Sequence, residues 1–209
     1  MPMPEFTSQQ IAELSELHRS LVTEERNLAD RVKWQQRLDD SVATILGIPS
    51  QAMLLAREFS QFRLPLVKGK APRSVTRNPD QVQLENYARR LKSELDGFLE
   101  RKKRRHKVTV ISAPGGVVAT IELVSDGAAA KAEVRMANKT EQDEVHSILQ
   151  AAEHRMAQWV YVWRSVRVFA GNKIHICKPQ RRLEWTETQA LLDAADVIAE
   201  VAEIRGKNA

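Results

Sequence analysis

Three carboxylates in one β-rich stretch are the strongest candidates for catalytic residues in this sequence. Glu122, Asp126 and Glu133 lie in a run of short alternating segments that we predict to be three strands. Carboxylate oxygens are ligands for hard divalent cations, provided that they converge on one ion. The three residues therefore define an alternative function for the chain, a metal-dependent nuclease or another nucleic-acid-processing enzyme.

Other catalytic patterns are missing from the sequence. It contains no G-x-S-x-G motif, no Walker A motif and no G-x-G-x-x-G motif. Cys177 is the only cysteine and no HExxH motif is present, so we expect no disulfide, no metal site and no cofactor. His175 and Cys177 share one face of a predicted strand, where a structural role is the simpler interpretation. A non-enzymatic accessory or interaction protein is the favoured function.

The basic residues are concentrated in two segments. The run ERKKRRHKVTV, residues 100–110, places six Lys or Arg in positions 101–107, and residues 63–79 contain five more with no acidic residue. These segments carry +11 and the whole chain carries +5, so the remaining residues carry a net charge of −6. Cations that neutralise phosphates release counterions from nucleic acid. The distribution predicts contact with nucleic acid or with an acidic protein surface.

A third, smaller basic group precedes the last predicted helix, whose N-terminus would attract anions. The alternative interpretation is that the cations of each group are solvated and bind no ligand. The helix dipole stabilises cations at a helix C-terminus, and loop arginines pair with nearby carboxylates. The predicted anion-binding residues are Arg101, Lys102, Lys103, Arg104, Arg105 and Lys107 in the first segment, Lys68, Lys70, Arg73 and Arg77 in the second, and Lys178, Arg181 and Arg182 in the third.

Residues 8–46 are predicted to form one long amphipathic helix that ends at Gly47 and Pro49. Its apolar residues recur every seven positions, as in a coiled-coil seam. Because such a helix exceeds what a small sheet covers, we expect a homodimer or docking on a partner helix; packing on the rest of the chain is the alternative. The seam residues are Leu14, Leu21, Leu28, Gln35 and Val42.

The helices and strands that carry these residues are predicted from the spacing of apolar side chains along the sequence. Alternating segments between residues 107 and 136 predict a βββ meander, and residues 166–177 predict a ββ hairpin around Gly171. Helices are predicted from Ser50, from Pro79 or Asp80, from Thr140 and from Thr186, where Thr186 begins a capping box. The predicted fold class is α+β, with an antiparallel sheet packed with helices.

The predicted organisation has three parts. Residues 1–49 hold the long helix, residues 50–78 hold a short helix and a basic, proline-rich linker, and residues 79–206 form a core of order αβββαββα. The composition, 43% apolar and 28% charged, is typical of a globular chain, and its alanine and arginine content indicates a bacterial source. No apolar run of 18 residues and no secretory signal is evident, so we expect a cytoplasmic protein with no membrane span.

Overall fold

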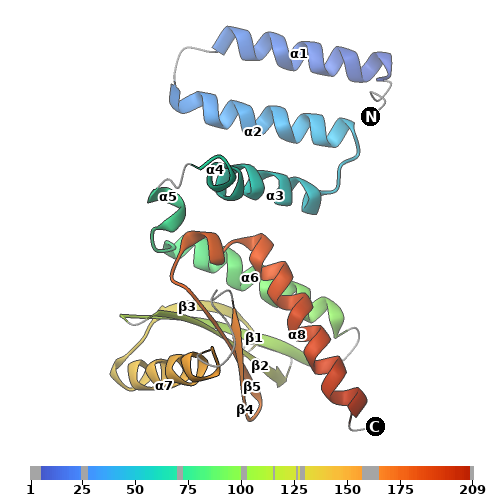
Figure 1. The fold of residues 1–209 in the computed structure, drawn as a ribbon. Helices are drawn as coiled ribbons and strands as arrows, with labels where there is room; N and C mark the ends of the chain where they lie inside the picture. Colours follow the sequence, from blue (N-terminus) through green and yellow to red (C-terminus); the bar gives the residue numbers. More distant parts are fainter. Residues whose placement is uncertain are drawn as a thin grey trace. The chain divides into compact units, whose positions relative to one another are not determined.

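A computed structural model describes residues 6–24, 28–69, 73–99, 103–114, 116–125, 127, 130–156 and 165–207. The chain divides into two compact units, Met1–Arg57 and Glu58–Ala209. The structure is drawn in Figure 1. None of the helices in the described ranges combines the length and the apolar character that a membrane span requires.

The first unit is helical. It contains α1 (Ser8–Glu24), α2 (Leu28–Ile45) and nearly all of α3 (Ser50–Glu58). The side-chain amide of Gln10 donates to the carbonyl of Ile45 over 2.9 Å, which ties the start of α1 to the end of α2 in an antiparallel pair. The structure thus has two helices where the seven-residue pattern predicts one, because the apolar stripe packs helix against helix within the same chain.

The predicted end of this region is confirmed. Gly47 adopts a φ of 63°, and the amide of Ile48 donates to the carbonyl of Ala43 over 2.8 Å, which is typical of a helix C-terminus closed by glycine. Of the predicted seam residues, Leu14 and Val42 are half-buried and Gln35 is exposed, while the side chains of Leu21 and Leu28 lie outside the described parts.

The second unit begins with short helical turns where the sequence predicts a linker. They are η1 (Phe59–Arg63), α4 (Leu64–Val67) and α5 (Arg73–Thr76). Pro65 stands in the first turn of α4, where a helix needs no amide donor. Next, α6 (Gln81–Phe98) begins at Asp80, whose carboxylate accepts the amide of Gln83 over 2.9 Å.

Five strands form one mixed sheet: β1 (Arg104–Ala113), β2 (Gly116–Ser125), β3 (Ala132–Met136), β4 (Val166–Ala170) and β5 (Lys173–Lys178). Their order is β3-β1-β2-β5-β4. All neighbours are antiparallel except β3, which pairs with β1 in parallel. The prediction of an antiparallel βββ meander is therefore wrong: β5 occupies the free edge of β2, and β3 crosses to the far edge of β1.

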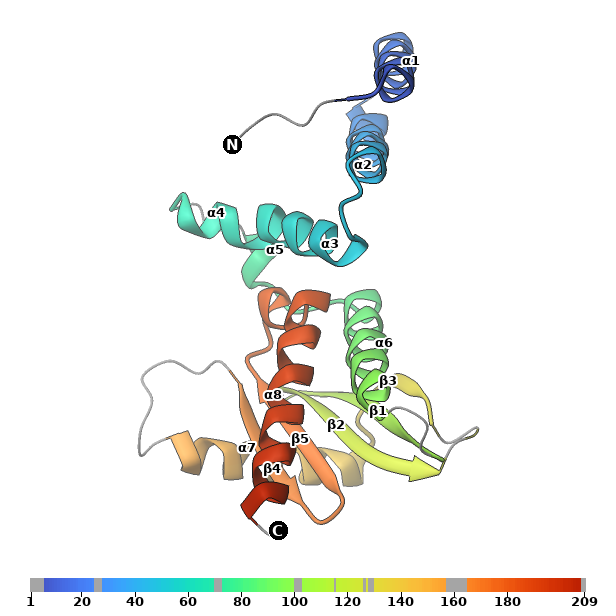
Figure 2. The ribbon, with the colours of Figure 1, turned by 90° about the vertical axis from the view of Figure 1, so that its right-hand side faces the viewer.

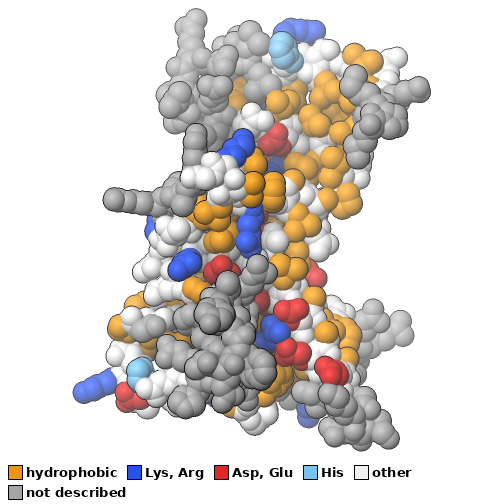
Figure 3. Space-filling view, viewed as in Figure 1, with side chains coloured by type: hydrophobic (Ala, Val, Ile, Leu, Met, Phe, Trp, Pro, Cys, Tyr) orange, Lys and Arg blue, Asp and Glu red, His pale blue; other side chains and the backbone are white. Residues whose placement is uncertain are grey.

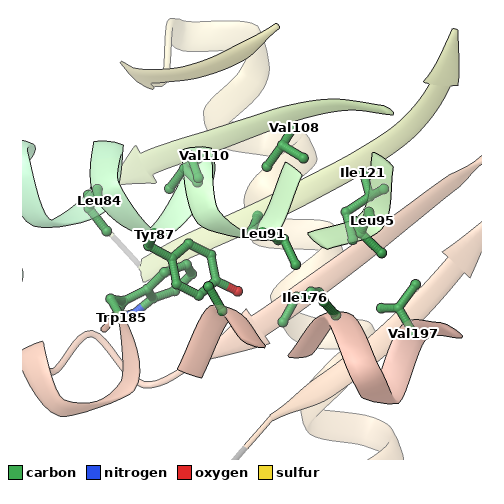
Figure 4. Close-up of a cluster of buried hydrophobic side chains, with 14 of the residues drawn as sticks. Leu84, Tyr87, Leu91, Leu95, Val108, Val110, Ile121, Ile176, Trp185 and Val197 are labelled. Carbon is green, nitrogen blue, oxygen red and sulfur yellow. The ribbon is translucent and has the colours of Figure 1, made fainter. Parts of the chain in front are cut away.

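Helices cover both faces of the sheet. Figure 2 shows α6 and α8 (Glu187–Lys207) side by side on one face, and α7 (Lys139–Met156) packs on the other. The larger core lies under α6 and α8 (Figure 4). The smaller core lies under α7 and contains Val118, Val145 and Leu149. Gly116, with a φ of 156°, packs closely against this smaller core: an added Cβ would lie 3.0 Å from the Cδ1 atom of Leu149, so that side chain would have to shift.

The carboxylate of Glu58 joins the start of the second unit to its last helix. Its oxygens accept the backbone amides of Glu187 over 2.9 Å and of Thr188 over 2.8 Å. The predicted cap is also confirmed, since the hydroxyl of Thr186 accepts the amide of Gln189 over 3.2 Å. The free amides at the N-terminus of α8 are thereby satisfied by groups of the chain itself.

Candidate nucleic-acid interface

The first basic segment lies where α6 leads into β1. Arg101 and Lys102 lie outside the described residues. Lys103 and Arg104 are exposed, and their side chains form no ion pair with any other described residue. Arg105 and Lys107 are half-buried. This end of α6 therefore presents two cations that pair with no carboxylate of the described residues.

The strand divides the basic run between two faces. Successive side chains of a strand point to opposite faces, so Arg104 faces the α6 and α8 side while Arg105 and Lys107 face the α7 side. The ammonium of Lys107 lies 3.7 Å from Glu133, which also pairs with Lys131 over 2.8 Å. The hydrogen bond from Lys131 is the main reason that the pKa of Glu133 is lowered. One ligand therefore cannot contact the whole run.

The second and third basic segments meet at the opposite end of α6. The amide of Arg182 donates to the carbonyl of Arg77 over 2.9 Å. Arg77 and Arg181 are exposed, with no ion pair to another residue in the described ranges. Residues more than 100 positions apart in the sequence are thus brought to one surface.

Arg182 itself is part of the fold. Its guanidinium donates to the side chain of Gln83 over 2.7 Å, lies 3.4 Å from Asp80 and stacks 5.8 Å from the ring centre of Phe62. Lys68 is exposed in the turn after α4. Lys70 lies outside the described residues, as does the side chain of Arg73.

Lys178 is not available to an external anion, so that prediction is wrong. Its side chain is 0% exposed, and its ammonium lies 2.5 Å from Asp193. The same carboxylate oxygen accepts the hydroxyl of Tyr87 over 2.6 Å. The ammonium lies 4.3 Å from the ring centre of Tyr87 and 4.7 Å from that of Trp185. Burial lowers the pKa of Lys178 and raises that of Tyr87.

The predicted nuclease carboxylates do not converge in the described parts of the chain. Glu122 lies on β2 and accepts the side-chain amide of Asn172 over 3.0 Å, whereas Glu133 lies on β3. Because β1 separates their strands, their backbones are roughly 10 Å apart. Asp126 lies outside the described residues. Within the described ranges, no group of three His, Cys, Asp or Glu side chains could hold a metal ion.

His175 and Cys177 take structural places on the sheet. The Nδ1 atom of His175 on β5 lies 3.0 Å from the hydroxyl of Thr120 on the adjacent strand β2. Cys177 is buried, and burial raises the pKa of its thiol to about 12. A thiol with so high a pKa stays protonated at neutral pH and is a poor nucleophile.

His106 is a candidate site residue that the sequence pattern did not predict. Its Nδ1 atom lies 3.0 Å from a carboxylate oxygen of Asp96, and its backbone amide donates to the same oxygen over 2.7 Å. The other oxygen of Asp96 is bonded to Lys92. Burial favours a higher pKa for Asp96, but the bonds from Lys92 and His106 outweigh it and the pKa is lowered. A half-buried histidine that is oriented by a carboxylate is a candidate binding residue.

Acidification below pH 7 should destabilise the protein through His175, which is buried, and His106, which is half-buried. Burial lowers the pKa of His106, despite Asp96, and that of His175, despite Glu144; Lys92 and Lys173 act in the same direction as burial. The unfolded chain then binds protons near pH 6.5 that the folded chain does not bind. The contribution of the two histidines to the free energy of unfolding is therefore fully present above about pH 6.5. It is lost as the pH decreases below that value.

The test is urea unfolding between pH 7.5 and 5. The test variants are His106→Asn and His175→Asn, in which the side-chain amide can replace Nδ1. Each should reduce the slope of the unfolding free energy against pH by up to about 1.4 kcal/mol per pH unit. His146→Asn, at an exposed position, is the control and should leave the slope unchanged. An unchanged slope in both test variants would contradict the prediction.

Comparison of the chain with protein-family models, with curated protein sequences and with solved structures returned no match.

Proposed function

We propose that the protein is a non-enzymatic accessory protein that binds nucleic acid through the exposed cations at the two ends of α6. The observation that supports this most directly is the backbone hydrogen bond between Arg182 and Arg77, which brings two distant basic segments together. Arg77 and Arg181, one from each segment, are exposed and have no ion pair in the described ranges. The fold does not use the charge of either side chain. Phosphates would supply the missing negative charge.

The second contact would come from Lys103 and Arg104 at the other end of the helix. The 18 residues of α6 span roughly 27 Å. This length approaches the roughly 34 Å of one duplex turn. Elsewhere on the second unit, Figure 3 shows basic and acidic side chains interspersed on the visible face, so an extended polyanion would be held at separate points.

In the same proposal, the α1–α2 pair contacts a second copy of the chain. Ile11 is 54% exposed, and Leu46 and Ile48 are each 38% exposed, so the first unit retains apolar side chains at its surface after the two helices have paired. Multi-angle light scattering of the full chain over a range of concentrations is the measurement. A strict monomer would remove this part of the proposal and leave the nucleic-acid part standing.

A salt titration by fluorescence anisotropy tests the nucleic-acid part, with a labelled generic duplex and the full chain. Each neutralised phosphate contributes roughly 0.9 to the log–log slope, so four cations give a slope near −3.6 and roughly a 100-fold loss of affinity between 50 and 200 mM salt. The variants Arg77→Gln/Arg181→Gln and Lys103→Gln/Arg104→Gln should each remove about half of the slope.

The matched control is Lys131→Gln/Lys139→Gln, which also removes two positive charges and leaves the four cations in place. It should change the slope little. Absence of binding at low salt would reject nucleic acid as the ligand and favour an acidic protein surface. A wild-type slope in both test variants would show that these cations are only solvated.

A further inference from the structure

The layer between the sheet and the α6–α8 pair has a hollow at its open end. A cavity of about 150 Å³ lies there, and α6, α8 and three strands contribute to its walls. Leu95, Ile121 and Ile198 are among its apolar lining residues. His106 and Asn172 are the polar residues of the lining. The cavity therefore offers an apolar interior with polar groups on one side.

The cavity lies beside a wider surface hollow of about 610 Å³. Leu123, Ile174 and Val201 line both, so the two are adjacent, and Arg104 and Ser125 line only the outer one. A small molecule of sufficient length could occupy the inner cavity and reach the outer hollow.

Polarity increases steadily along this path. The cross-strand pairs of β1 and β2 on this face are Val108 with Ile121, then His106 with Leu123, then Arg104 with Ser125. These pairs run from the buried core to the exposed guanidinium over four residues, roughly 13 Å. A molecule that matches this gradient has an apolar end and a charged end.

We propose that this end of the layer binds a small monocarboxylate whose apolar end is about the size of a benzene ring. Apolar protein cavities of about 150 Å³ are large enough to hold benzene. The guanidinium of Arg104 has the fork geometry that suits a carboxylate, and no described residue pairs with it. Burial lowers the pKa of His106 despite the Asp96 carboxylate at Nδ1, so the inner cavity holds no positive charge at neutral pH. The cations Arg104 and Lys173 both line the outer hollow, where the carboxylate would lie.

Isothermal titration calorimetry of the full chain with 3-phenylpropionate tests the site, with 3-phenyl-1-propanol as the uncharged probe. The carboxylate should bind at one saturable site. Arg104→Gln should weaken binding of 3-phenylpropionate about 3- to 10-fold, because a charge-assisted hydrogen bond at an exposed site is lost. The same variant should weaken binding of 3-phenyl-1-propanol less than about twofold, because the alcohol carries no charge. Val201→Trp should fill both hollows and weaken both probes at least about tenfold.

Lys139→Gln, at an exposed cation at the start of α7 on the other face of the sheet, is the matched control and should leave both affinities unchanged. Arg104 also belongs to the proposed nucleic-acid contact, so the alcohol and Val201→Trp separate the two proposals. The inference is overturned if 3-phenylpropionate gives no saturable heat, if Arg104→Gln affects both probes equally, or if a Val201→Trp protein with a wild-type circular dichroism spectrum binds as before.

Discussion

Replacement of Asp193 by alanine should lower the free energy of unfolding by about 3 to 5 kcal/mol. The ammonium of Lys178 would lose its only carboxylate partner among the described residues while its side chain stays fully enclosed. The hydroxyl of Tyr87 would lose its acceptor at the same time. A buried charge without a counter-ion is among the most destabilising changes in a core, because the lost solvation is not replaced.

Urea denaturation at pH 7 provides the measurement, and Asp196→Ala provides the control. Asp196 lies one turn further along α8, and its side chain is 56% exposed where it pairs with Arg167 over 3.0 Å. Its loss should cost less than about 1 kcal/mol. The double variant Lys178→Met/Asp193→Ala should cost less than the sum of its single variants, because the buried charge is gone. Equal costs for Asp193→Ala and Asp196→Ala would contradict the argument.

Replacement of Trp185 by alanine should also cost about 3 to 5 kcal/mol. The residue is 0% exposed, and its ring packs edge-on against Tyr87 with the ring centres 5.0 Å apart. Its indole nitrogen donates to the carbonyl of Pro179 over 3.0 Å. Trp185 lies beside Tyr87 in the larger core (Figure 4). Removal of the indole leaves a large void beside the ammonium of Lys178 and leaves the carbonyl of Pro179 without its donor.

Chemical unfolding followed by far-ultraviolet circular dichroism suits this test, because that signal does not depend on the indole. Trp185→Phe keeps most of the ring volume and loses the hydrogen bond, so it should cost clearly less than alanine. Phe98→Ala removes an aromatic ring that is 55% exposed, and it serves as the exposed-site control. A cost for Trp185→Ala no larger than that of the control would show that the core repacks around the loss.

Local patterns in the sequence predict much of the second unit. The alternation in β1, β2, β4 and β5, the turn at Gly171 and the cap at Thr186 depend on neighbouring residues, and the structure contains all of them. The position of β3 depends on which strand occupies the free edge of β2. That outcome is decided by β5, about forty residues later in the chain, so no local pattern contains it.

Two side chains show why the candidate site was harder to predict. Lys178 continues the face of Ile174 and Ile176, so alternation alone would have placed it in the core; its basic neighbours Arg181 and Arg182 favoured an exposed loop instead. His106 alternates in the same way with Val108 and is hidden within a run of cations. In both cases the period of the strand was a better guide than the local charge.

The strand order also affects how the second unit forms during synthesis. β5 lies between β2 and β4, and α8 packs beside α6 on the same face of the sheet, so the centre of the unit is completed by residues 166–207. A ribosome that adds roughly 5 to 20 residues per second needs roughly 2 to 8 s to make this last stretch. Until then, one edge of β2 has no strand partner, and the side of α6 that packs on α8 is uncovered in the nascent chain. Folding on the ribosome is therefore not vectorial for this unit, and a chaperone that shields the β1–β2 hairpin during that interval would raise the yield of native protein.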